Sequence, residues 1–209
     1  MFCKKLKERR TLKQVEEHPV RYGSQHLSII VGHTNKSPGA YSSQLKTTEY
    51  AYMSEFASLL KLEVMRFECS ASIHFRDDGG ISGAYLRALS NGPACIIELH
   101  FNAFNGIVSG CETLFSEKGD DVGVRERLFA QKIQNAMVSA LDNQDRGLKH
   151  RVSKGERGFF NLSRVSSVPS ILIEPFFGDN SKDAKNFHAK RSLVAASLAK
   201  TFKEFVDGN

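Results

Sequence analysis

The sequence predicts an α/β fold in which a mostly parallel sheet is covered by helices on both faces. Four short runs, rich in β-branched side chains, are almost continuously apolar, as strands buried on both faces are. Longer segments with the spacing of amphipathic helices separate these runs. The 209 residues are 41% hydrophobic and 25% charged, which is ordinary for one globular domain with a full core.

Each predicted strand is a short apolar run bounded by turn-forming residues. In chain order the runs are HLSIIVGH, ACIIELH, GCETLFSE and SILIEPF, at residues 26–33, 94–100, 110–117 and 170–176. Two further segments, at 35–44 and 75–83, are rich in Gly, Ser, Pro and Asp. We expect both of these to be loops.

Three longer segments have the spacing of helices. The first follows a Thr-Thr capping pair at 47–48 and carries apolar residues on one face to about residue 64. The second repeats an apolar residue every four positions over 129–141. The third follows capping candidates at 179–181 and has its apolar residues on one side over 194–205. These helices supply the layers that cover the sheet.

The positive charge of the chain is concentrated at its amino terminus. Of the net charge of +6, residues 1–13 contribute +5, because they hold six basic side chains and one acidic side chain. We therefore divide the chain into a basic arm, residues 1–25, and one domain, residues 26–209. The arm is expected either to be solvated or to contact an anionic polymer or membrane face. Neither alternative supports sequence-specific nucleic-acid binding.

The sequence contains no evident membrane anchor or secretory signal. No window approaches the roughly eighteen consecutive apolar residues of a membrane span, and no apolar stretch follows the basic amino terminus. The prediction is a protein made in the cytoplasm without an evident signal peptide. The four cysteines, Cys3, Cys69, Cys95 and Cys111, form no C-x-x-C pair and are expected to be free thiols.

Three of the four apolar runs end with an ionisable residue. These residues are His33, His100 and Glu174. The carboxyl ends of parallel strands meet at one edge of a sheet, so residues far apart in the sequence can converge there. A histidine in a strand is also often a hydrogen-bonded core residue, and this alternative stays open for His33 and His100.

A metal site at this edge needs a further ligand, and Glu49 is the candidate. It follows the capping pair at the start of the first predicted helix, where the helix dipole favours a carboxylate. Two imidazoles and one carboxylate suit catalytic Zn²⁺ and leave one tetrahedral position for water. Glu174 is then available for proton transfer. Glu49 as an ordinary acid of the first turn is the alternative.

The motifs resemble those of zinc-dependent N-acetylmuramoyl-L-alanine amidases of the type 3 family. The matching stretches, in order, are IIVGHTNKSPGA, the glutamate of TTEY, FRDD, YLRALSN, ELHFNAF, GCETLF and ILIEPFFGDN. The resemblance implies that His33, Glu49 and His100 bind zinc and that Glu174 is catalytic. It implies a substrate, the amide between N-acetylmuramic acid and L-alanine of peptidoglycan. It also implies a mixed, twisted sheet of about six strands.

The sequence departs from the family pattern at Glu98, where a small polar residue is common. Glu98 lies two positions before His100, hence on the same face of the strand. It is expected to orient a ligand histidine, to reach substrate, or to pair with a basic neighbour. Asn102 is expected to fix the neighbouring loop or the substrate, or to be an ordinary loop residue. Pro175 and the Gly-Asp pair at 178–179 also differ from the family pattern.

Other functions remain compatible with these motifs. A zinc carboxypeptidase would use a similar site to shorten the stem peptides of peptidoglycan. A cell-wall-binding domain without catalysis would keep the metal for stability alone. For an amidase without a signal, we expect a phage-type lysin that accumulates in the cytoplasm and acts on the cell wall. A secreted host enzyme whose leader is missing is the alternative.

Overall fold

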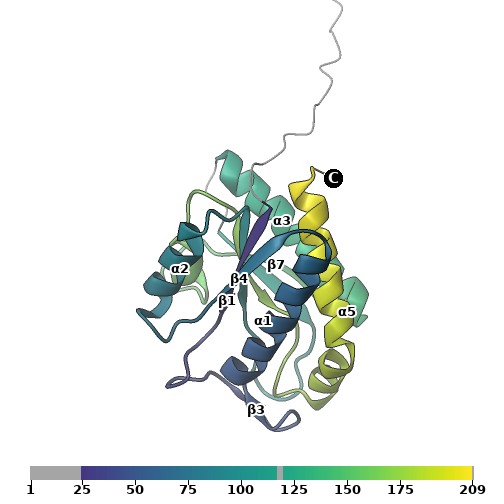
Figure 1. The fold of residues 1–209 in the computed structure, drawn as a ribbon. Coiled ribbons are helices and arrows are strands. Elements are labelled where there is room, and N and C mark those ends of the chain that lie inside the picture. Colours follow the sequence, from purple (N-terminus) through teal and green to yellow (C-terminus); the bar gives the residue numbers. More distant parts are fainter. Residues whose placement is uncertain (1–24, 117–119, 209) are drawn as a thin grey trace, which may run out of the picture.

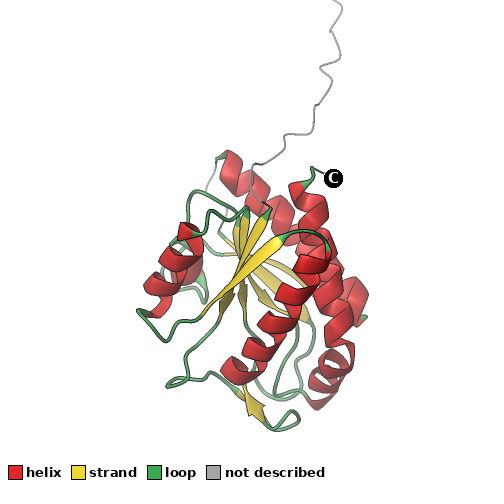
Figure 2. Cartoon of the chain, viewed as in Figure 1, coloured by secondary structure: helices red, strands yellow, loops and turns green. Residues whose placement is uncertain are grey.

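The computed structural model describes residues 25–116 and 120–208. The predicted basic arm, apart from residue 25, and Cys3 lie outside the described residues. Within them, the strands form a central sheet that lies between helices, with α2 on one side and α1 and α5 on the other (Figures 1 and 2). The α/β fold with helices on both faces is confirmed.

The sheet has six strands and is mixed. They are β1 (His26–Val31), β4 (Ser70–His74), β5 (Cys95–Leu99), β6 (Cys111–Phe115), β7 (Asp145–His150) and β8 (Ser170–Glu174), in the spatial order β4-β1-β5-β8-β6-β7. Neighbouring strands are parallel except for β6 and β8, which are antiparallel. The carboxyl ends of β1, β5 and β8 therefore lie at one edge of the sheet, together with the amino end of β6.

Helices cover the two faces unequally. One face carries α1 (Glu49–Arg66), α3 (Asp121–Leu141) and α5 (Ser181–Val206), whose apolar sides pack into the main core with alternate residues of the inner strands. The other face carries α2 (Gly80–Ser90) and the single turn α4 (Phe159–Leu162), each over a smaller cluster. Alternation of strand side chains between the faces explains why both are apolar.

The helix caps confirm two of the predicted starts. The Thr48 hydroxyl caps α1 by accepting a hydrogen bond from the Ala51 N–H at 3.4 Å. Asn180 caps α5 by accepting from the N–H groups of Lys182 and Asp183 at 2.9 and 3.1 Å. Each cap satisfies donors that the first turn leaves unpaired. Thr48 also places Glu49 as the first residue of its helix.

The expected loop at 75–83 is wrong in its last four residues, which form the first turn of α2. This helix begins without a side-chain cap, after Gly79 in the left-handed region with φ of 79°. A Cβ on Gly83 would lie 2.7 Å from the Asp78 carbonyl oxygen. The glycines are thus used for close packing at a helix start and not only for a loop. The short hairpin β2 (Tyr41–Ser42) and β3 (Thr47–Thr48) lies partly inside the expected loop at 35–44.

The cysteines of the described residues agree with the prediction of free thiols. Three of the cysteines, Cys69, Cys95 and Cys111, are buried free thiols. Among the helices of the described residues, none combines the length and the apolar character that a membrane crossing requires.

We predict that His74 makes the fold sensitive to acid. It ends β4, and burial, followed by the positive charges of Arg87 and His26, lowers its pKa from 6.5 to about 4. The unfolded chain therefore binds this proton more tightly, so stability is present above pH 6.5 and is lost as the pH falls toward 4. Urea unfolding of His74→Gln should show a smaller loss between pH 7 and pH 5 than wild type, by on the order of 1 kcal/mol. Equal losses in the two proteins would contradict this origin.

Candidate metal centre and active site

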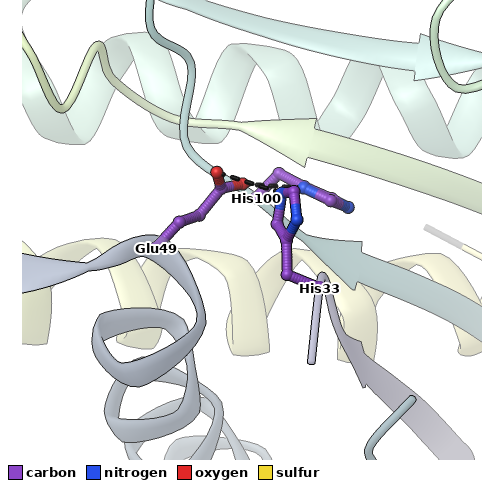
Figure 3. A group of neighbouring side chains, drawn as sticks. All are labelled: His33, Glu49 and His100. Carbon is purple, nitrogen blue, oxygen red and sulfur yellow. Dashed lines mark hydrogen bonds and ion pairs between the residues drawn. The ribbon is translucent and has the colours of Figure 1, made fainter. Parts of the chain in front are cut away.

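Three side chains from separate elements converge at the edge of the sheet where β1, β5 and β8 end. His33 lies two residues after β1, His100 directly follows β5, and Glu49 begins α1. One ligand atom from each lies within 4.8 Å of the others. Figure 3 shows the carboxylate of Glu49 facing the two imidazole rings. The structure therefore brings together the three residues predicted as metal ligands.

The backbone at His33 is held in an unusual conformation. His33 has φ of 66°, in the left-handed region that residues with a Cβ rarely occupy. Such a conformation costs on the order of 1–3 kcal/mol and persists only where the surroundings fix it. It directs Nε2 of the ring to within 3.1 Å of Oε2 of Glu49. A Cβ on Gly39 would lie 2.7 Å from this ring, so the neighbouring turn closes tightly over it.

Glu49 is buried and accepts hydrogen bonds on both oxygens. Oε1 lies 2.7 Å from Nδ1 of His100 and accepts from the Phe101 N–H at 3.1 Å, while Oε2 accepts from the Ala40 N–H at 3.3 Å. Burial by itself raises the pKa of Glu49, but hydrogen bonds and charge from His100 and His33 outweigh it and lower the pKa to about 2. The carboxylate is thus ionised at neutral pH, as a metal ligand must be.

His100 is fixed on both sides of its ring. Nδ1 faces Glu49, and Nε2 lies 3.1 Å from Oε1 of Glu98. A Cβ built on Gly32 would lie 2.3 Å from the ring, so only glycine at that position leaves room for the imidazole. The ring therefore has little freedom to turn away from the site.

The residues at this edge fit a zinc ion. Two nitrogen donors and one carboxylate oxygen converge, and among the described residues no lysine or arginine forms an ion pair with Glu49. Two glycines leave space for the ligand rings where a Cβ would collide. A buried carboxylate between two imidazoles is the donor set of open catalytic zinc sites.

Glu174 lies beside these ligands. It is the last residue of β8 and is 1% exposed. The Arg157 guanidinium forms an ion pair and hydrogen bond with Oε1, whereas Oε2 is buried and has no hydrogen-bond partner among the described residues. Burial raises the pKa of Glu174, and the positive charge of Arg157 opposes this rise. The three candidate ligands, Glu174 and Arg157 line one pocket of about 370 Å³. The fourth predicted residue is therefore in the same cavity.

A comparison with known protein families finds a match that includes the residues of this site. A family model described as N-acetylmuramoyl-L-alanine amidase (Amidase_3) matches residues 27–204. The chain belongs to this family. The match begins in β1 and ends within α5. The three candidate ligands and Glu174 therefore lie inside the family domain.

Two known proteins are similar in sequence to about half of the chain. Over 102 residues the chain is 32% identical to an uncharacterized cell wall amidase of Bacillus anthracis. Over 98 residues it is 35% identical to the uncharacterized protein YqiI of Bacillus subtilis (strain 168). Each match covers 47% of this chain, but 18% of the first relative and 43% of the second. The matched segment thus spans less than half the length of these relatives.

Solved structures of this family share the fold. An N-acetylmuramoyl-L-alanine amidase from Clostridium difficile 630 superposes with a TM-score of 0.75 at 19% identity, covering 90% of this chain and 100% of that chain. The catalytic domain of the CD27L endolysin, which targets Clostridia difficile, gives a TM-score of 0.67 at 23% identity, covering 87% of this chain and 96% of that domain. At these identities the likeness establishes the arrangement of strands and helices.

Asn102 connects Glu174 to its surroundings through Arg157. Its Oδ1 accepts from Arg157 at 3.0 Å, and its Nδ2 donates to Oε1 of Glu112 at 2.9 Å. Glu112 in turn pairs with Arg146 at 2.8 Å. Asn102 is 5% exposed, so it is a buried link and not an open loop residue. Arg157 lines the pocket, so Asn102 supports a pocket residue by direct contact.

Sequence reasoning missed Arg157 and Glu112. Arg157 lies in a polar segment between two glycines, which carries no signal for contact with a strand end. Glu112 did carry a signal, because an acid in the buried run GCETLF needs a partner. Its position at the start of the run placed it apart from the other strand-end residues. Since β6 runs antiparallel to β8, Glu112 pairs in register with Glu174 at the same edge of the sheet.

We predict that Gly32→Ala weakens metal binding while the fold survives. Gly32 has no left-handed backbone, so alanine is excluded only by the 2.3 Å approach of its Cβ to the His100 ring. The displaced imidazole should weaken zinc affinity by at least about tenfold, the lower end of the cost of disturbing ligand orientation. Competition with a chromogenic chelator measures it. The matched control is Gly155→Ala, whose Cβ would meet nothing within 4 Å. Wild-type affinity in Gly32→Ala would refute the role of this contact.

Proposed function

We propose that the chain is a zinc-dependent peptidoglycan hydrolase that cleaves the amide between N-acetylmuramic acid and L-alanine. The observation that carries the proposal is the single pocket lined by two histidines, one ionised carboxylate and a second buried carboxylate with a free oxygen. Membership of the amidase family supports the choice of amide bond. His33, Glu49 and His100 are the proposed zinc ligands, and Glu174 is the proposed catalytic residue.

Zinc held by these ligands supplies Lewis acidity, which makes water a nucleophile near neutral pH and polarises a carbonyl oxygen. The proton transfers fall to Glu174. Its Oε2, which no group in the described part of the chain engages in a hydrogen bond, takes the proton of the attacking water and delivers it to the nitrogen of the departing amine. Arg157 holds Oε1 and fixes the carboxylate during both transfers. A leaving amine has to be protonated, so the carboxylate is needed in addition to a metal.

The Arg157 contact keeps Glu174 usable as a base. Burial raises the pKa of Glu174 and so disfavours the ionised form that can take a proton from water. The guanidinium opposes that effect by favouring the ionised form. Asn102 holds the same guanidinium from the other side. The polar link from Glu112 through Asn102 to Arg157 therefore supports the proposed catalytic carboxylate.

We predict that Glu174→Gln abolishes release of stem peptides while zinc stays bound. Glutamine keeps the shape of the side chain but cannot accept and return the proton, so turnover should fall by about 100-fold or more. Turbidity loss of purified cell walls and bound zinc measure the two properties. Retained lytic activity in this variant would remove Glu174 from the mechanism.

The products of the wild-type protein test the reaction itself. Mass spectrometry of digested peptidoglycan should show intact stem peptides freed from the glycan, and a chelator should prevent their release. Shortened stems still attached to glycan would indicate a zinc carboxypeptidase. Loss of folding on chelation, with no solubilised product before chelation, would indicate a binding domain whose metal is structural.

We predict that Arg157→Met moves the acidic limb of the pH–rate profile to higher pH. Glu174 has to be ionised to act as a base, and Arg157 is the group that lowers its pKa against the effect of burial. Without the guanidinium the pKa rises, so activity is lost at a higher pH as the solution is acidified. The control is Arg164→Met, because Arg164 contacts the Phe160 ring and not Glu174. Superimposable profiles for Arg157→Met and wild type would contradict the assignment.

A further inference from the structure

Glu98 is the most deeply buried acid next to the site, and the proposed reaction does not use it. It lies on β5 with an exposed fraction of 0%. Side chains from four separate places contact its carboxylate: Arg76 after β4, Tyr85 on α2, His100 after β5 and Asn161 on α4. A full set of donors around one carboxylate indicates a built site and not an accidental contact.

The donors divide between the two oxygens of Glu98. Oε1 pairs with the Arg76 guanidinium and lies 3.1 Å from Nε2 of His100. Oε2 accepts from the Tyr85 hydroxyl at 2.7 Å. The amide nitrogen of Asn161 lies 3.2 Å from Oε1 and 3.0 Å from Oε2. The pairing with a buried guanidinium requires the ionised carboxylate, which can accept hydrogen bonds but not donate them.

A carboxylate oxygen faces each ring nitrogen of His100, Oε1 of Glu49 at Nδ1 and Oε1 of Glu98 at Nε2, and a neutral ring can donate to only one of them. A nitrogen that binds a metal carries no hydrogen, so with Nδ1 as the ligand the hydrogen belongs on Nε2. Nε2 faces Oε1 of Glu98, and the other nearby group, Nη2 of Arg76 at 3.4 Å, is a donor only. Without a hydrogen, Nε2 could accept only from this more distant group and would oppose its lone pair to the carboxylate oxygen at 3.1 Å, whereas with a hydrogen it donates to Oε1. A neutral ring has one N–H, so Nδ1 retains its lone pair. That lone pair lies on the side of the ring that faces Glu49.

We propose that Glu98 is a positioning residue that holds His100 as the Nε2–H tautomer with Nδ1 directed to the metal, and that Arg76, Tyr85 and Asn161 hold Glu98 in place. The inference rests on the proposed function, because it takes His100 as a zinc ligand. A histidine ligand whose second nitrogen donates to a carboxylate is oriented and made more basic. Loss of such a partner weakens metal affinity by roughly 10–100-fold.

The alternative is that Glu98 only neutralises Arg76. The two roles are separated by removing both charges together with Arg76→Met/Glu98→Met, since replacing a buried ion pair with apolar side chains is often neutral for folding. If Glu98 served Arg76 alone, the double variant would bind zinc as wild type does. If Glu98 positions His100, its zinc affinity falls 10–100-fold in competition with a chromogenic chelator, while its thermal unfolding stays cooperative.

The control is Arg66→Met/Glu63→Met. It removes another arginine–glutamate pair, at the end of α1 opposite Glu49, with 3.0 Å between Nη1 of Arg66 and Oε1 of Glu63, and neither residue forms an ion pair with a proposed ligand among the described residues. This variant should keep the zinc affinity of wild type. An equal loss in both double variants would show a general effect of removing charge and would overturn the proposal.

A second readout needs no variant at the ion pair. In ¹⁵N–¹H spectra of the zinc-loaded wild type, the His100 ring proton, assigned by its absence in His100→Gln, should be bonded to Nε2. A proton on Nδ1 would overturn the proposal. Wild-type protein that binds no zinc would overturn both the proposed function and this inference. Wild-type zinc binding together with wild-type affinity in Arg76→Met/Glu98→Met would overturn the inference alone.

Discussion

Burying a carboxylate costs several kcal/mol unless positive charge and hydrogen bonds compensate it, and four glutamates are buried at one edge of this sheet. Glu98 pairs with Arg76, Glu112 with Arg146 and Glu174 with Arg157. Three of the four acids are thus each paired with one arginine. Glu49 contacts imidazoles and backbone N–H groups instead. Among the described residues, the carboxylate without an arginine partner is the one that lies between the two histidines, which is where the proposed zinc ion would supply the balancing positive charge.

The direction of the strands explains how these acids come together. β1, β5 and β8 are parallel and end at the site, so ionisable residues at or just after their ends converge. β6 runs antiparallel to β8 and reaches the same edge with its start. Its acid, Glu112, is accordingly the second residue of the strand and not the last. In all four strands, the ionisable residues therefore lie at or near the end that reaches the site, which is the carboxyl end of β1, β5 and β8 and the amino end of β6.

The sequence was sufficient for the inner strands and for the convergence of His33, Glu49, His100 and Glu174, because buried strands leave apolar runs and polar ends. It was insufficient for β4 and β7, the two edge strands, whose residues are mostly half-buried and so form no apolar run. The contact between Arg157 and Glu174 could not be predicted from the sequence either. Its contact depends on how a polar loop folds back over β8, which neither periodicity nor capping determines.

Glu98 shows what a buried carboxylate at this position requires of its surroundings. A carboxylate in place of a small polar side chain brings a buried negative charge to the centre of the sheet, and such a charge is stable only with donors on both oxygens. The donors come from α2, from α4 and from the segment after β4. Two of them belong to the elements that cover the thinner face of the sheet, so the packing of that face and the orientation of His100 are coupled through one carboxylate. Residues coupled in this way act as a unit, and the effects of changing them separately do not add.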